Sequence, residues 1–142
     1  LLKRARAAVK RAIPVNEELI AENTTSISKC ISAMLDIEDI SIDVESLLNN
    51  GQTPREILAG SLKDARFMDL SGCHVEQVLY YISCGAPVFA LSGANDAVLL
   101  TGYDQNSVTV YDPMVPGNSA VSFADADELF SENGNVFLTY LK

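Results

Sequence analysis

The sequence is poor in the side chains that most often carry metal, disulfide and proton-transfer chemistry. It has one histidine, His74, and three cysteines, with no Cys-x-x-Cys pair among them. This scarcity argues against a disulfide framework and a four-ligand zinc site, since both need several such residues at short spacing. If the segment between Cys73 and Cys84 is helical, those cysteines lie about 16 Å apart, too far for a disulfide. The sequence therefore predicts no metal site and no cofactor.

Basic residues are scarce beyond the start of the chain. Five of the ten lie in the first eleven positions, so residues 12–142 carry five basic and nineteen acidic side chains. A surface this negative repels phosphate backbones, because nonspecific nucleic-acid affinity comes from cationic groups. Nucleic acid is therefore not an expected partner of residues 12–142. Residues 1–13 predict a basic amphipathic helix, with an arm for a membrane surface or nucleic acid as the alternative.

Long apolar runs are also missing. No stretch approaches the roughly 18 to 20 residues of a membrane span, and no signal peptide is recognisable. With 142 residues, 48% hydrophobic and 20% charged, the chain has the size and composition of one folded domain, which we predict to span residues 1–142. Because it begins at Leu1 rather than a methionine, we expect a piece of a longer protein, to which residues 1–13 could connect.

The first half of the chain predicts helices, and the second half mainly strands. Helix signals include capping threonines, a proline at the first helical position and a stop at Asn49-Asn50-Gly51. The expected helices are residues 1–13, 17–22, a segment capped by Thr24 or Thr25 that contains Cys30, 43–49, 53–63, 75–83 and 125–130. The expected strands are residues 67–70, 88–91, 97–103, 108–111, 120–122 and 135–140. The short link at 104–107 predicts an antiparallel hairpin, and the order of elements predicts an α+β domain.

Three segments carry the most specific pattern in the sequence. They read Gly-Ala-Pro-Val-Phe-Ala from Gly85, Asp-Ala-Val-Leu-Leu-Thr-Gly-Tyr-Asp from Asp96, and Val-Thr-Val-Tyr-Asp-Pro from Val108. This pattern resembles the papain-like bacteriocin-processing, or double-glycine, cysteine peptidases. Those proteins have a Gly-Pro-Val strand, a strand that opens with histidine and ends in Gly-Tyr-Asp, and a strand that ends in Asp-Pro. The resemblance implies a papain-like fold in which an N-terminal helical half packs on a C-terminal antiparallel sheet.

The same resemblance assigns three candidate catalytic positions. Cys30, followed by the Ala-Met-Leu at 33–35, matches the nucleophile, Asp112 matches the aspartate that orients the histidine, and Asp96 occupies the position of the histidine itself. A carboxyl group with a pKa near 4 is a weak base toward a thiol near 8.5, and its charge raises the pKa of that thiol. This substitution predicts a catalytically inactive site.

Two further departures from the family pattern also predict a loss of catalytic activity. Ile31-Ser32 replaces the Gly-Pro that follows the family's cysteine, and no glutamine for an oxyanion hole occurs in residues 20–29. With Thr25 as cap, Cys30 falls in the fifth helical position, beyond the first turn where a helix dipole lowers a thiol pKa. We therefore expect Cys30 to be a small buried core residue.

These observations favour a non-catalytic pseudo-peptidase domain that binds a peptide or protein segment as an interaction module. Family habit places such a domain in a larger bacterial protein outside the cytoplasm or at the cell surface. The alternative is an active cysteine peptidase or amidase with Cys30 as nucleophile and an unconventional base, either His74 or a residue of a partner domain. A third hypothesis is a structural spacer without a ligand. His74 itself is expected to face solvent at the start of a helix.

Other polar and aromatic residues suggest weaker alternatives. Asp96 and Asp112, helped by Asp104, could bind Ca²⁺, although no EF-hand spacing is present. An acidic group is expected in the first turn of the last helix, where carboxylates favour the dipole: Asp125, Asp127 and Glu128. Four tyrosines are expected at the core and its rim: Tyr80, Tyr81, Tyr103 and Tyr111.

Overall fold

The structure is a computed structural model that describes residues 13, 25–115 and 117–142. Its elements are α2 (Ser26–Ile37), α3 (Val44–Asn49), α4 (Pro54–Ser61), β1 (Arg66–Asp69), α5 (Val75–Ser83), β2 (Val88–Gly93), β3 (Asp96–Tyr103), β4 (Ser107–Tyr111), β5 (Asn118–Ser122), α6 (Phe123–Glu132) and β6 (Phe137–Leu141). None of these helices is long and apolar enough to cross a membrane. The helices expected at 1–13 and 17–22 lie outside the described residues, apart from Ile13.

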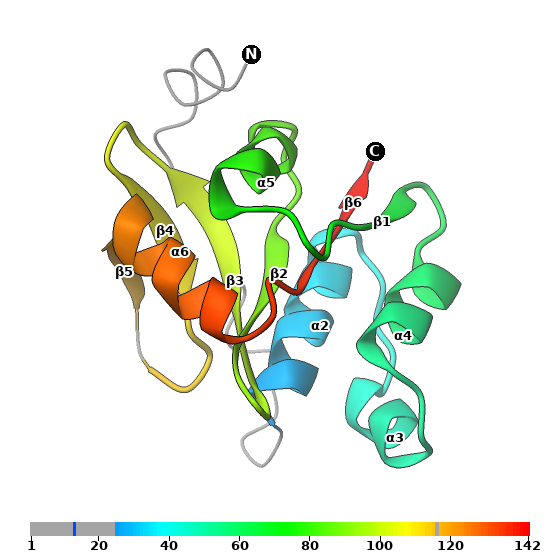
Figure 1. The fold of residues 1–142 in the computed structure, drawn as a ribbon. Coiled ribbons are helices and arrows are strands. Elements are labelled where there is room, and N and C mark those ends of the chain that lie inside the picture. The colour runs from blue at the N-terminus through cyan, green and yellow to red at the C-terminus, as the bar shows by residue number, and fades with distance from the viewer. Residues whose placement is uncertain (1–12, 14–24, 116) are drawn as a thin grey trace.

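One antiparallel sheet forms the centre of the molecule and is covered by helices on both faces (Figure 1). Its strand order is β1-β6-β2-β3-β4-β5. Because side chains alternate along a strand, Phe89 and Leu99 join the core beneath α2, α3 and α4, whereas Val88 and Leu100 join the core beneath α5 and α6. This confirms the predicted α+β fold with an N-terminal helical half on the sheet, and adds a second helical layer opposite it.

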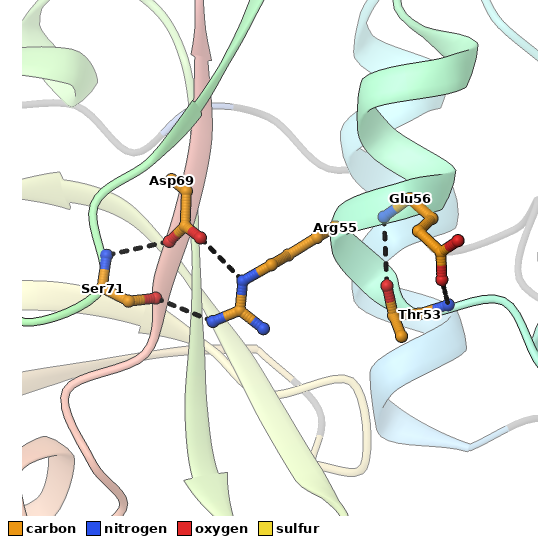
Figure 2. Close-up of polar contacts among 5 residues, drawn as sticks. All are labelled: Thr53, Arg55, Glu56, Asp69 and Ser71. Atoms are coloured by element: carbon orange, nitrogen blue, oxygen red, sulfur yellow. Dashed lines mark hydrogen bonds and ion pairs between the residues drawn. The ribbon is translucent and has the colours of Figure 1, made fainter.

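Capping side chains start the helices of the N-terminal half. Thr25 Oγ1 accepts a hydrogen bond of 3.2 Å from the Ser28 N–H at the start of α2. At α4, Thr53 and Glu56 bond each other's backbone N–H groups in a capping box, as Figure 2 shows. The bond at Thr25 identifies this residue, rather than Thr24, as the cap of α2. The capping box confirms the predicted threonine-proline start of α4.

A polar group attaches α4 to the edge strand β1 (Figure 2). Arg55 Nε donates to Asp69 Oδ2 at 2.7 Å, and Arg55 Nη2 donates to Ser71 Oγ at 3.0 Å. Partial burial raises the pKa of the Asp69 carboxyl, but hydrogen bonds from Ser71 and Arg55 outweigh it and leave that pKa below its ordinary value. The cluster holds the helical layer against the sheet at this end.

Four described helices end with a residue in the left-handed conformation, and three of them use glycine there. Gly51 after α3, the helix stop predicted from the sequence, and Gly85 after α5 both have φ of 93°, and Gly134 after α6 has φ of 84°. After α2, Asp39 takes this place with φ of 60°. Its N–H donates to Asp36 O, and the next N–H, of Ile40, donates to Leu35 O. This is a Schellman motif with a non-glycine residue in the left-handed position.

The structure adds one detail to the sequence predictions and corrects another. The last strand, β6, lies between β1 and β2 rather than beside its sequence neighbour β5. Helix α6 begins at Phe123 with Ser122 as cap, so Asp125 lies in its first turn while Asp127 and Glu128 do not. The placement of Asp127 and Glu128 in that turn was therefore wrong. Asp127 instead accepts a hydrogen bond of 3.4 Å from the Val75 N–H at the start of α5.

Replacing Asp39 by glycine should raise the free energy of unfolding by roughly 0.5 to 1 kcal/mol, because glycine adopts a left-handed conformation without steric cost. Urea denaturation followed by circular dichroism measures the change. Gly51→Ala is the matched control at the equivalent position after α3, and it should lower stability by about 1 kcal/mol. A stabilising Gly51→Ala, or a destabilising Asp39→Gly, would contradict this account of the two helix ends.

Candidate functional site

The first residues of α2 and β3 meet the last residues of β4 at one end of the sheet. Residues Leu99 and Tyr111 are register partners in the antiparallel pair of β3 and β4. Asp96, the first residue of β3, and Asp112, directly after β4, therefore lie at the same end of neighbouring strands, as the sequence predicted. Helix α2 packs across β3 on this face of the sheet (Figure 1).

Ser26 is the α2 side chain that contacts Asp96. Its hydroxyl donates a hydrogen bond of 3.1 Å to Asp96 Oδ1 and accepts one of 3.1 Å from the Ala97 N–H. Ser26 is only 3% exposed, while Asp96 is exposed. Where the family pattern has a histidine, this chain therefore has a carboxylate that is hydrogen-bonded to a serine on the first turn of α2.

Cys30 lies one turn further along α2 and is completely buried. It belongs to the core that also contains Ala97, Leu99 and Tyr111. Burial in this core, and secondarily the negative charge of Asp112, raise the pKa of the Cys30 thiol far above its ordinary value. The expected core position of Cys30 is confirmed, and these surroundings favour the neutral thiol over the thiolate.

Asp112 begins the β4–β5 connection and organises its turn. Asp112 Oδ1 accepts a 2.9 Å hydrogen bond from the Met114 N–H, and Asp112 O accepts one of 3.1 Å from the Val115 N–H. Met114 and Val115 are 60% and 53% exposed, and Lys29 Nζ lies 4.0 Å from Met114 Sδ. Two exposed apolar side chains therefore adjoin the two aspartates.

His74 lies on the other side of the sheet from Cys30. It is the exposed N-cap residue of α5, and its backbone N–H donates to Gln77 Oε1 at 2.7 Å. Helix α5 packs on the core opposite the one that contains Cys30. The hypothesis that His74 serves as the base for Cys30 is therefore wrong, because the sheet separates them. A base from a partner domain stays a prediction.

Asp104 is at the wrong end of the hairpin to help Asp96 and Asp112 hold a cation. It lies in the β3–β4 turn, where Oδ1 accepts 2.8 Å hydrogen bonds from the N–H groups of Asn106 and Ser107. These bonds lower the pKa of its carboxyl. Across the described residues, no three histidine, cysteine or acidic side chains come close enough to hold a metal ion. The proposed role of Asp104 in a calcium site is wrong.

The four tyrosines separate into buried and accessible pairs. Tyr103 and Tyr111 are buried, Tyr81 is half-buried, and Tyr80 is exposed. The rings of Tyr80 and Tyr81 meet edge to face with centroids 5.4 Å apart on α5, away from Asp96. As expected, these tyrosines are core and rim residues.

Comparison with known proteins supports the fold and nothing finer. No protein-family model matches the chain, and no curated protein sequence matches it. Its structure is similar to the crystal structure of a Bacillus anthracis protein described as a candidate C39-like peptidase, with a TM-score of 0.75 and 18% identity over 92% of this chain and 94% of that one. The resemblance to the papain-like bacteriocin-processing peptidase fold, first visible in residues 85–113, is thereby confirmed.

Sequence reasoning selected Cys30 and overlooked Ser26. The available signal was the position of Ser26, directly after the Thr25 cap and four residues before Cys30 on the same helix face. A residue at the start of the helix reaches the strand ends, whereas a residue one turn later reaches only the sheet interior. The family pattern, which assigns only the nucleophile, the base and the residue that orients the base, does not identify this serine.

Replacing Ser26 by alanine should lower the free energy of unfolding by about 1 to 3 kcal/mol, because it leaves the buried Ala97 N–H without its acceptor. Chemical denaturation measures this loss. The control is Ser131→Ala, which removes an exposed hydroxyl bonded to Glu128 O and should change stability by less than about 0.5 kcal/mol. Equal effects of the two substitutions would show that the Ser26 bridge is not structurally important.

Alkylation should distinguish Cys30 from Cys84, which is exposed. In the native protein at pH 8, iodoacetamide should label Cys84 readily and leave Cys30 unmodified, because the Cys30 thiol is buried and its pKa is raised. In 8 M urea both should be labelled. Mass spectrometry of tryptic peptides gives the extent at each site, and Cys84→Ser serves as control for assignment. Native labelling of Cys30 at a rate similar to that of Cys84 would contradict the description of its burial.

Proposed function

We propose that this domain is a non-catalytic member of the C39-like peptidase fold that binds an extended peptide or protein segment. The observation that carries the proposal is the bond between Ser26 and Asp96, with Cys30 buried beside them. At the position where the family pattern requires an imidazole, the chain has a carboxylate already engaged with a serine hydroxyl. The domain would serve as an interaction module rather than a hydrolase.

The chemistry of the three positions supports an inactive site. Cysteine catalysis requires a thiolate within reach of a base, together with a group that orients the base. Here Asp112 adds negative charge near Cys30 and raises its pKa, which opposes formation of the thiolate. A carboxylate at Asp96 is too weak a base to compensate. On this proposal, the domain keeps the three family positions while its charges at Asp96 and Asp112 oppose thiolate formation.

Binding is supported by what is exposed at the same end of the sheet. The carboxylate of Asp96 is accessible, and Met114 and Val115 present apolar surface beside Asp112. No described residue forms an ion pair with Asp96 or Asp112. Exposed apolar residues next to polar ones are typical of surfaces that bind protein segments. Family habit extends the proposal to a role in a larger bacterial protein, outside the cytoplasm or at the cell surface.

Selection of 12-residue peptides against the immobilised 142-residue chain tests this function. Peptides that bind at this site should lose at least about tenfold in affinity when Met114→Ser is combined with Val115→Ser, since the apolar contact is removed. Asp96→Asn with Asp112→Asn keeps both hydrogen-bond acceptors and should weaken cationic peptides alone. Tyr80→Ser, an exposed aromatic residue on the opposite face, should change nothing.

The same peptides should remain intact after prolonged incubation with the protein. Mass spectrometry of the mixture detects cleavage, and Cys30→Ala should give the same result as the unmodified chain. Cleavage that disappears in Cys30→Ala would establish the enzyme instead. Failure of every selected peptide to respond to the Met114 and Val115 substitutions would place binding elsewhere and overturn the proposed site.

A further inference from the structure

A hollow of about 590 Å³ opens at the end of α2 that is remote from Ser26. Its lining comes from two loops, residues 38–42 after α2 and residues 60–65 at the end of α4. The C-terminal ends of α2 and α4 lie on the same side of the molecule (Figure 1). This volume is in the range of ligand-binding sites. The hollow is separate from Asp96 and Asp112, which lie at the opposite end of α2.

The lining of this hollow is partly apolar, and its rim carries acidic side chains together with the exposed Lys63. Ile40 and Leu62 pack against the core on their inner sides, and Ile42 is 39% exposed. Asp39 and Asp64 are exposed at the rim. Such a combination suits the side chain of lysine or arginine, whose aliphatic stem contacts apolar surface while its charged end stays near water.

One carboxylate of the lining is already neutralised, and two are not. Glu38 Oε2 accepts a 3.2 Å hydrogen bond from Tyr140 and lies 3.0 Å from Lys142 Nζ. Asp39 and Asp64 form no ion pair with any described residue. The unneutralised negative charge therefore lies at the rim, where a cation from outside can reach it.

A second hollow of about 630 Å³ adjoins the first and has the opposite charge. The two share residues 63–65, and the second is lined in addition by Arg66, Leu141 and Lys142. Arg66 is exposed at the start of β1, which is an edge strand of the sheet. Lys63 and Asp64 line both hollows, so a ligand that covers the two meets an excess of carboxylates at the Asp39 end and an excess of cationic side chains at the Arg66 end.

We propose that the two adjoining hollows bind a peptide segment that carries a basic side chain followed within a few residues by an acidic one. The basic side chain lies in the hollow of Asp39 and Asp64, and the acidic side chain faces Arg66. A nucleic acid fits this surface poorly because phosphates would meet Asp39 and Asp64. A small amine can pair with the carboxylates of the first hollow alone. A peptide that carries both a basic and an acidic side chain can pair with charges in both hollows. This site acts independently of the one at Asp96.

The probe is the synthetic peptide acetyl-Leu-Lys-Ala-Glu-Leu-amide, titrated into the full 142-residue chain with isothermal calorimetry. Asp39→Asn combined with Asp64→Asn should weaken binding about tenfold, and Arg66→Gln about threefold, since each removes exposed charge pairs. Asparagine is tolerated in the left-handed conformation of residue 39. Glu132→Gln on α6 removes one exposed carboxylate on the other face and should leave the affinity unchanged.

A steric variant tests the hollow without altering charge. Gly60 lies within α4, and a side chain added there meets no atom within 4 Å of its Cβ position, so Gly60→Leu should fold normally and occupy the hollow. It should weaken the probe at least about tenfold, whereas Gly60→Ala should not. Circular dichroism and thermal unfolding confirm that both variants remain folded.

Peptide variants complete the test through coupling energies. Replacing the probe's lysine by glutamine should remove its sensitivity to the Asp39 and Asp64 substitutions, and replacing its glutamate by glutamine should remove its sensitivity to Arg66→Gln. Absence of probe binding, binding that ignores Gly60→Leu, or equal affinity for agmatine would overturn the proposal. Loss of binding at Met114 and Val115 affects the proposed function alone, so the two proposals fail independently.

Discussion

A single serine hydroxyl determines how the helical half of this domain meets its sheet at the candidate site. Ser26 donates to Asp96 and accepts from the Ala97 N–H, so one buried hydroxyl of α2 satisfies two polar groups of β3. Buried polar groups that lack partners are costly, and this bridge removes that cost at the point where the helix crosses the strand. It attaches the first turn of α2 to the start of β3, and Cys30 is buried in the core one turn later.

The same bridge bears on the proposed lack of catalysis. Both hydrogen-bonding functions of the Ser26 hydroxyl are occupied by the protein, and the Asp96 carboxylate is oriented toward the serine. Cys30 lies in an apolar core where its neutral thiol is favoured, and the charge of Asp112 strengthens this preference. Under the proposed function, the burial that stabilises this core is also the main cause that disfavours a thiolate.

Local signals made most of the fold predictable, while the contacts between elements were less accessible. Residues 75–83 were predicted as a helix with the observed bounds, and Thr53-Pro54 and Gly51 marked a helix start and a helix end, because these signals act within one turn of the chain. The insertion of β6 between β1 and β2 depends on long-range pairing, for which the sequence contains no local signal. The candidate site was likewise predictable only in part. The shared end of Asp96 and Asp112 follows from strand order, whereas the pairing of Asp96 with Ser26 depends on how α2 lies across β3.

The likeness in fold to a C39-like peptidase at 18% identity shows that this architecture can be built from largely different sequences. In this chain, the alternation of buried residues places Phe89 and Leu99 on one face of the sheet and Val88 and Leu100 on the other. That pattern restricts polarity and volume in the core but leaves the strand ends free to vary. Under the proposed function, Asp96 takes the place of the histidine of the family pattern at the start of β3, and Ser26 satisfies its carboxylate. Function in this architecture is decided by a few side chains at the strand ends, and the fold alone does not determine it.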